Sequence, residues 1–94
     1  MKVYKYILPT CAISEIEMPK HADILHVNLQ REKFCIWAVV DTEETEHETR
    51  RFRIAGTGHP LEIAPYEYQQ FEYIGTVFVE ELVFHVFEID EPIA

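Results

Sequence analysis

The chain has 94 residues, of which 48% are hydrophobic and 13% aromatic, and its 8 Lys and Arg against 17 Asp and Glu give a net charge of −9 at pH 7. This length predicts a single domain over residues 1–94, and the apolar content excludes a disordered chain, because such chains lack the bulky side chains that offset ordering entropy. No apolar run could span a membrane, no signal-peptide pattern is present, and the negative charge disfavours direct nucleic-acid binding, which depends on cationic contacts to phosphate.

Two short strands are predicted at the start of the chain. Val3 to Leu8 is rich in β-branched and aromatic residues and stops at Pro9. Glu15 to Met18 alternates polar and apolar side chains and stops at Pro19. Proline ends both runs because it lacks the N–H group that a strand ladder needs.

The next two runs predict longer strands joined by a turn at Arg31 and Glu32. Asp23 to Gln30 alternates in polarity, as a half-buried strand does. Its predicted apolar face holds Leu25, Val27 and Leu29. Lys33 to Asp41 is a continuous apolar run, which predicts a central strand covered on both faces, with Trp37 anchoring the core.

The middle of the chain predicts loops around one further strand. Thr42 to Glu48 is acidic and has no apolar residue, so we expect a solvated hairpin loop before a strand at Thr49 to Ala55. Gly56 to Pro60 is the strongest turn signal in the sequence, because glycine tolerates positive φ. Residues 61–70 predict a loop with at most one helical turn near Pro65.

The last two runs, Phe71 to Glu80 and Leu82 to Asp90, predict an antiparallel hairpin with a bulge or bend at Gly75. The chain therefore contains about six to seven strand-like runs and no convincing amphipathic helix. This pattern predicts an all-β domain, either a small antiparallel β-sandwich or a partly closed barrel, with at most one helical turn near residues 65–70.

Catalytic and metal-site signals are weak in this sequence. The two cysteines, Cys11 and Cys35, show no metal-ligand spacing, and we expect free thiols in a reducing cytoplasm, with a bridge between them as the alternative. None of the five histidines is paired at a ligand spacing, and His85 lies in an apolar run that favours a structural role. We therefore expect no catalytic residues, no metal and no cofactor.

The negative charge is concentrated in the last third of the chain, because residues 61–94 carry no Lys or Arg. The acidic residues there are Glu62, Glu67, Glu72, Glu80, Glu81, Glu88, Asp90 and Glu91. One interpretation is a solvated surface that also protects strand edges. The other is a surface that docks on a basic groove of a partner protein, in which case binding weakens as salt rises.

A small basic cluster precedes that acidic segment. Strand alternation places Arg51 and Arg53 on one face, opposite Phe52 and Ile54, where two guanidinium groups could bind an anion or could neutralise nearby glutamates. The following turn could direct backbone amides at the same anion, although it lacks the ending of a phosphate-binding loop. The candidate ligand residues are Arg51, Arg53, Gly56, Thr57, Gly58 and His59.

Several motifs in chain order resemble a family of small, mostly uncharacterised bacteriophage and prophage proteins. They are Tyr4-Lys5-Tyr6, Glu17-Met18-Pro19, Trp37-Ala38-Val39-Val40-Asp41, Arg51-Phe52-Arg53-Ile54 followed by Gly56-Thr57-Gly58-His59-Pro60, Tyr73-Ile74-Gly75-Thr76-Val77 and His85-Val86-Phe87-Glu88. The resemblance implies a compact phage accessory protein that acts in the host cytoplasm.

Together these observations lead us to expect a non-enzymatic phage accessory protein. It would bind a host protein with a basic surface and inhibit or redirect it, for example as an anti-defence protein. Two alternatives stay open. The first is a small-ligand protein that binds a nucleotide signal through the arginine and glycine-turn residues, and the second is a self-associating structural protein, such as a homodimer.

Overall fold

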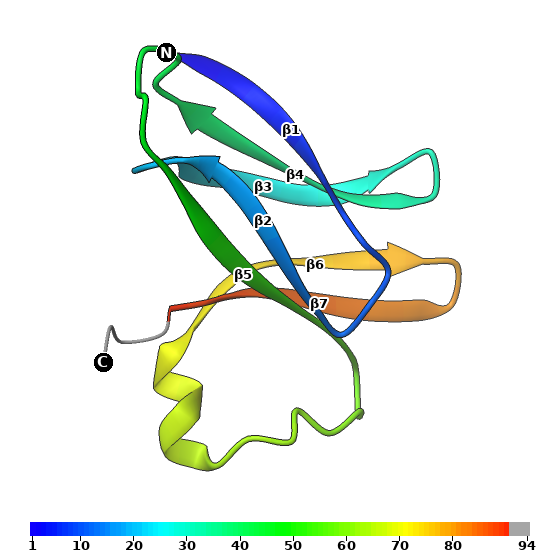
Figure 1. Ribbon diagram of the computed structural model, residues 1–94. Helices are drawn as coiled ribbons and strands as arrows, with labels where there is room; N and C mark the ends of the chain where they lie inside the picture. The colour runs from blue at the N-terminus through cyan, green and yellow to red at the C-terminus, as the bar shows by residue number, and fades with distance from the viewer. Residues whose placement is uncertain (91–94) are drawn as a thin grey trace.

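Seven antiparallel strands account for most of residues 1–90, the part of the chain that the computed structural model describes (Figure 1). In chain order the elements are β1 (Lys2–Leu8), β2 (Ile13–Pro19), β3 (Asp23–Gln30), β4 (Lys33–Val40), β5 (His47–Gly56), the 3-10 helix η1 (Pro65–Gln70), β6 (Phe71–Val79) and β7 (Leu82–Ile89). The predicted all-β class, the strand number and the single helical turn near residue 65 are confirmed. No helix among the described residues is long and apolar enough to cross a membrane.

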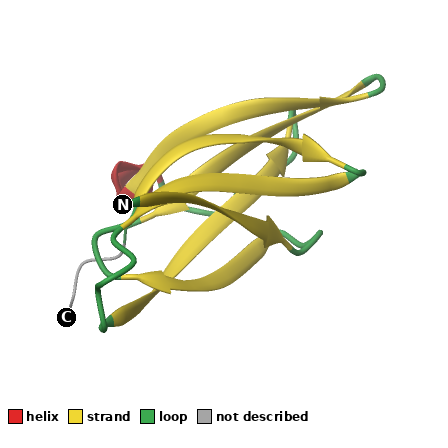
Figure 2. Ribbon diagram, turned by 90° about the horizontal axis from the view of Figure 1, so that it is seen from above, coloured by secondary structure: helices red, strands yellow, loops and turns green. Residues whose placement is uncertain are grey.

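The strands form two sheets, which Figure 2 shows from above. One sheet has the order β1-β4-β3 and the other the order β2-β5-β7-β6. The edge strands β3 and β6 lie close together, so the sandwich is nearly closed on that side. Its shortest dimension, 17 Å, corresponds to the depth of two packed sheets.

The approach of β3 to β6 depends on Gly75, where the ladder between β6 and β7 shifts register. A Cβ atom at this position would lie 2.9 Å from Cγ1 of Val27 on β3, which is closer than two carbon atoms can approach. The predicted bulge at Gly75 is confirmed. Because glycine has no side chain, β6 can approach β3 closely at this position.

The hydrophobic core fills the space between the sheets. Strand alternation directs every second side chain inward, and Phe52 at the centre of β5 is fully buried. Other side chains that are almost completely buried are Leu8, Met18, Ile36, Val40, Val77 and Val86, and Phe34 and Phe87 are buried nearly as fully. Burying one such side chain stabilises the fold by about 1.5–3 kcal/mol, which makes this cluster the main source of stability.

Two predictions about the core are wrong. The ladder between β3 and β4 shifts at Leu25, so this side chain is exposed while Ile24 packs against the core. Trp37 does not anchor the core, because β4 directs its even-numbered side chains inward and leaves Trp37 half-buried on the outer face beside His26. The strand β4 is central in its sheet, as predicted, but only one of its faces is covered by the other sheet.

The acidic segment at residues 42–48 is not a hairpin loop. β4 pairs with β1 and β3, whereas β5 pairs with β2 and β7, so this segment crosses from one sheet to the other. Its last two residues, His47 and Glu48, already belong to β5. The two antiparallel hairpins among residues 1–90 are β3–β4 and the predicted β6–β7 pair.

Two predicted turns are confirmed. Between β3 and β4, Arg31 and Glu32 have positive φ angles of 53° and 66°, the geometry of a tight hairpin turn that usually contains glycine. After β5, the backbone N–H of His59 donates to the carbonyl of Gly56, and Gly58 adopts a φ of 83°. A Cβ at Gly56 would lie 2.7 Å from the ring of the exposed His59, so a larger residue there would require this side chain to turn aside.

Candidate functional site

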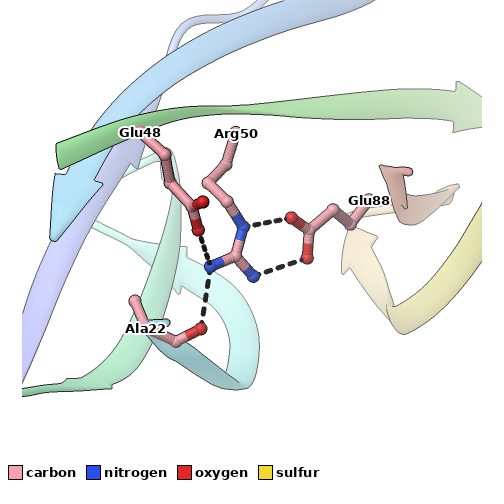
Figure 3. Close-up of polar contacts among 4 residues, drawn as sticks. All are labelled: Ala22, Glu48, Arg50 and Glu88. Atoms are coloured by element: carbon pink, nitrogen blue, oxygen red, sulfur yellow. Dashed lines mark hydrogen bonds and ion pairs between the residues drawn. The ribbon is translucent and has the colours of Figure 1, made fainter. Parts of the chain in front are cut away.

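An ion pair between Arg50 and Glu88 lies between the sheets near one end of the sandwich (Figure 3). Arg50 points inward because it is two residues before the buried Phe52, and Glu88 lies opposite Phe52 on β7. The guanidinium group donates twice to the Glu88 carboxylate, through Nε and, at 2.9 Å, through Nη2. Its Nη1 atom donates to the carbonyl oxygen of Ala22 at 2.8 Å and lies 3.4 Å from the Glu48 carboxylate.

This arrangement satisfies the Arg50 charge within the protein. The hydrogen bonds to Glu88 raise the pKa of Arg50 above its already high ordinary value, against the opposing effect of burial. Paired donors to one carboxylate also fix the geometry of both side chains. Arg50 therefore ties β5 to β7 and to the turn between β2 and β3, and it is a structural cation rather than one available to a ligand.

Around this pair, carboxylates gather at one end of the sandwich, which we call the acidic end. The strand register brings together the end of β2, the starts of β3, β5 and β6, and the end of β7, with the crossing segment at residues 41–46 beside them. Its acidic residues are Asp23, Asp41, Glu43, Glu44, Glu46, Glu48, Glu72 and Asp90. Six of these residues precede residue 61, and only Glu72 and Asp90 belong to the acidic segment at residues 61–94. The concentration of negative charge in the folded protein therefore differs from its concentration along the sequence.

The cations near the acidic end neutralise only part of this charge. Lys20 pairs with Glu46 at 3.3 Å, and Arg51 lies 3.6 Å from the Glu15 carboxylate on β2. No ion pair within residues 1–90 involves Glu72. Among the described residues, Asp23, Asp41, Glu43, Glu44 and Asp90 of the acidic end likewise take part in no ion pair.

The acidic end is hollowed. A cavity of about 500 Å³ lies between the start of β5, the start of β6 and the end of β7. It is lined by Glu48, Thr49, Arg50, Arg51, Glu72, Glu88, Ile89 and Asp90. Two arginines and four carboxylates thus share this lining, and since Arg50 faces Glu48 and Glu88, the remaining two carboxylates are Glu72 and Asp90.

The predicted acidic site residues do not share one face. Glu72 and Asp90 belong to the acidic end, whereas Glu80 and Glu81 form the turn between β6 and β7 at the opposite end. At the Gly75 bulge the side chains of β6 change from even-numbered inward to odd-numbered inward. Even-numbered residues before and after the bulge, such as Glu72 and Glu80, therefore do not share one face of the strand. Of the others, Glu88 is the partner of Arg50, Glu62 and Glu67 lie between β5 and β6, and Glu91 lies outside the described residues.

Arg51, Arg53 and Gly56 lie on β5 in the four-stranded sheet, and Thr57, Gly58 and His59 begin the segment at residues 57–70, which we call the arch. Arg51 and Arg53 line one cavity of about 220 Å³, and the turn from Gly56 to His59 lines a second cavity of about 220 Å³. Leu61 of the arch lines both. The structure therefore places the arginines and the turn next to each other, in adjoining cavities rather than in one.

Hydrogen bonds fix His85 in a structural position, as expected. Its Nε2 atom lies 2.7 Å from the Thr57 hydroxyl, and its Nδ1 atom lies 3.1 Å from the Thr76 hydroxyl, which in turn lies 2.5 Å from the hydroxyl of Tyr73.

Residues 1–90 contain no group of three or more His, Cys, Asp or Glu side chains arranged to hold a metal ion. Cys11 and Cys35 form no disulfide, and only Cys11 is exposed.

Comparison with other proteins adds a family to this description. No curated protein and no solved structure matches the chain. The chain does match, over residues 1–94, the family described as a domain of unknown function, DUF7352. Because the match covers its whole length, the protein belongs to the DUF7352 family.

Proposed function

We propose that this protein is a non-enzymatic binding domain whose acidic end docks on a basic surface of another protein. The observation that carries this proposal is the hollow of about 500 Å³ at the acidic end, with carboxylates at its rim. A lysine or arginine side chain of a partner would enter the hollow between Glu72 and Asp90. Charge-assisted hydrogen bonds of this kind are about twice as strong as neutral ones.

The crossing segment at residues 41–46 widens the same surface. Asp41 and Glu44 accept backbone N–H groups from Glu43 and Glu46 within the segment, at 3.0 Å in each case, so the local backbone is held in place. A preorganised surface loses less entropy on binding than a mobile one. Opposite charge also speeds association and sets the orientation of the partner.

The resemblance to phage proteins supports a partner from the host cell. A small acidic protein that occupies a basic groove would block whatever that groove normally binds, so the proposed outcome is inhibition or redirection of a host protein. This is the activity expected of an accessory protein, including one directed against host defence.

The test compares two variants of equal charge. Glu43→Gln, Glu44→Gln and Glu72→Gln together alter the acidic end, whereas Glu62→Gln, Glu80→Gln and Glu81→Gln together remove the same charge elsewhere. Each triple variant changes the net charge from −9 to −6. Tagged wild type and variants are used to capture host proteins, and the affinity of each candidate partner is then measured with purified components.

A partner at the acidic end should bind the wild type and the second triple variant alike and should bind the first at least tenfold more weakly. Its affinity should also fall as salt rises from about 0.1 M to about 1 M, because the screening length shrinks from about 10 Å to about 3 Å. Equal weakening by both variants, or an affinity that does not respond to salt, would contradict the proposal.

A further inference from the structure

The arch at residues 57–70 covers the outer face of β5 and β7 without packing tightly on it. Figure 1 shows it leaving the end of β5, passing below the sheet and returning through η1 into β6. None of the residues of η1 is buried, and Tyr66 is 72% exposed. The connection therefore consists of an irregular stretch at residues 57–64 followed by one exposed 3-10 helix.

Hydrogen bonds and a ring contact hold the arch against the sheet, beginning with the Thr57 backbone N–H, which donates to the carbonyl of Val83 on β7 at 3.0 Å. Arg53 on β5 donates through Nη2 to the carbonyl oxygen of Pro60 at 3.2 Å. Tyr68 packs edge-on against Phe87 of β7 with a ring separation of 6.2 Å, and the backbone N–H of Asp90 donates to the carbonyl of Gln70. The arch is thus anchored at both ends, and the two adjoining cavities lie between the anchors.

Arg53 is incompletely satisfied in this position. Its Nε atom is buried and has no hydrogen-bond acceptor within residues 1–90, and the side chain makes no ion pair with any of them. A buried donor left without an acceptor costs about 1–3 kcal/mol, and more when the group is charged. Within residues 1–90 the acceptor of its guanidinium group is the neutral carbonyl of Pro60, so an added anion would supply the negative charge that these residues do not place beside it.

The second cavity has a different chemistry. It is lined mainly by apolar surface from Leu61, Ala55 and Phe87, with His85 and the turn at residues 56–59 at its margin. His85 is held rigidly by its two threonine neighbours, so its ring is a fixed wall. Apolar and aromatic walls of this kind accept a flat ring.

We propose that the groove under the arch binds a small anion that carries a flat heteroaromatic ring, with the chemistry of a nucleoside monophosphate. The phosphate lies at Arg53, and the ring lies against Phe87 between Leu61 and His59. Each cavity alone is smaller than the roughly 300–1,000 Å³ of a typical small-molecule site, so the proposed ligand occupies both and passes Leu61, which lines each of them. This site is separate from the acidic end, so either proposal can fail without the other.

Two carboxylates modulate the site. Glu62 and Glu67 line the same cavity as Arg53, so they repel an anion there and disfavour ligands with several phosphates. Glu67→Gln should therefore raise the affinity for the anion. A misfolded variant would bind more weakly, so an increase in affinity cannot result from a loss of folding.

The experiment measures binding of linear and cyclic nucleoside monophosphates to the full chain by calorimetric titration. Nucleosides without phosphate and inorganic phosphate serve as the comparison ligands. Arg53→Met should weaken binding about 10- to 100-fold, as expected for a lost hydrogen bond to a charged group. Lys33→Met, which removes a positive charge at the far hairpin, should leave the affinity unchanged.

Because Arg53 also holds Pro60, a second variant blocks the groove by another route. Leu61→Trp places a large side chain where the two cavities join, leaves every arginine in place, and should abolish binding while the thermal transition of the protein is retained. Absence of binding by every nucleoside monophosphate at millimolar concentration would overturn the proposal. So would binding of inorganic phosphate as tightly as the nucleotides, or binding that Leu61→Trp and Arg53→Met both leave intact.

Discussion

Replacing Glu88 by Gln should destabilise the protein by about 2 kcal/mol. Removing one partner of a fully buried ion pair costs about 3–5 kcal/mol, because the remaining charge is left without compensation. The side chains of Arg50 and Glu88 are 17% and 14% exposed, so some water reaches the orphaned guanidinium group. The carbonyl of Ala22 and the Glu48 carboxylate also remain beside it, and both effects reduce the loss.

A change of this size is measurable in a small domain. A chain of this length typically has an unfolding free energy of roughly 5–14 kcal/mol, and 1 kcal/mol shifts the melting temperature by about 4–8 °C. Glu88→Gln should therefore lower the melting temperature by about 8–16 °C. The free energy itself is obtained from urea unfolding followed by tryptophan fluorescence, with Trp37 as the probe.

A double-mutant cycle isolates the pair. Arg50→Met alone should cost at least as much as Glu88→Gln, while the double variant should cost less than the sum by about 1–2 kcal/mol. The matched control is Glu15→Gln at the more exposed Arg51 contact, which should cost no more than about 0.5 kcal/mol. Additive effects of the two substitutions, or equal losses at Glu88 and Glu15, would refute the assignment of Arg50 as a partly buried structural cation.

Three further predictions follow from local geometry. Arg31→Asn with Glu32→Gly should stabilise the protein by about 1 kcal/mol in urea unfolding, because both positions have positive φ that Asn-Gly accommodates; an unchanged midpoint would argue against this turn geometry. Ser14→Ala should leave stability equal or raise it by about 1 kcal/mol, since the Ser14 hydroxyl is buried with no hydrogen-bond partner among residues 1–90; a clear loss in the same assay would mean that the hydroxyl is bonded. In a thiol titration, Cys11 should react in the native protein and Cys35, which is 1% exposed, only after unfolding; zero reactive thiols in denaturant would indicate a disulfide.

Strand positions were predictable because alternation and proline stops are local signals. The shift at Leu25 was not, since no glycine or proline marks it and the residues on either side alternate normally. The crossing at residues 41–46 was missed for a related reason. A strand that pairs within its own sheet and one that passes to the opposite sheet have the same local pattern, and only the long-range ladders distinguish them.

The site was partly predictable on the same grounds. The face shared by Arg51 and Arg53 followed from alternation, and the turn after Gly56 followed from its two glycines and Pro60. The partner of Arg50 did not, because Glu88 is 38 residues away in the chain. Strand alternation does carry one signal for this pair: Arg50 is two residues before the apolar Phe52 and so lies on the same inward face, where an arginine needs an acidic partner on a neighbouring strand.

The close approach of β3 to β6 also determines where another chain could extend these sheets. Of the four edge strands formed by residues 1–90, β3 and β6 shield one another, so the accessible backbone edges are those of β1 and β2. Lysines at positions 2 and 5 protect β1, and Glu15, Glu17 and Pro19 protect β2. A strand from another molecule would thus have to add on one side of the domain only, and the charge of its side chains would determine which of the two edges it could join.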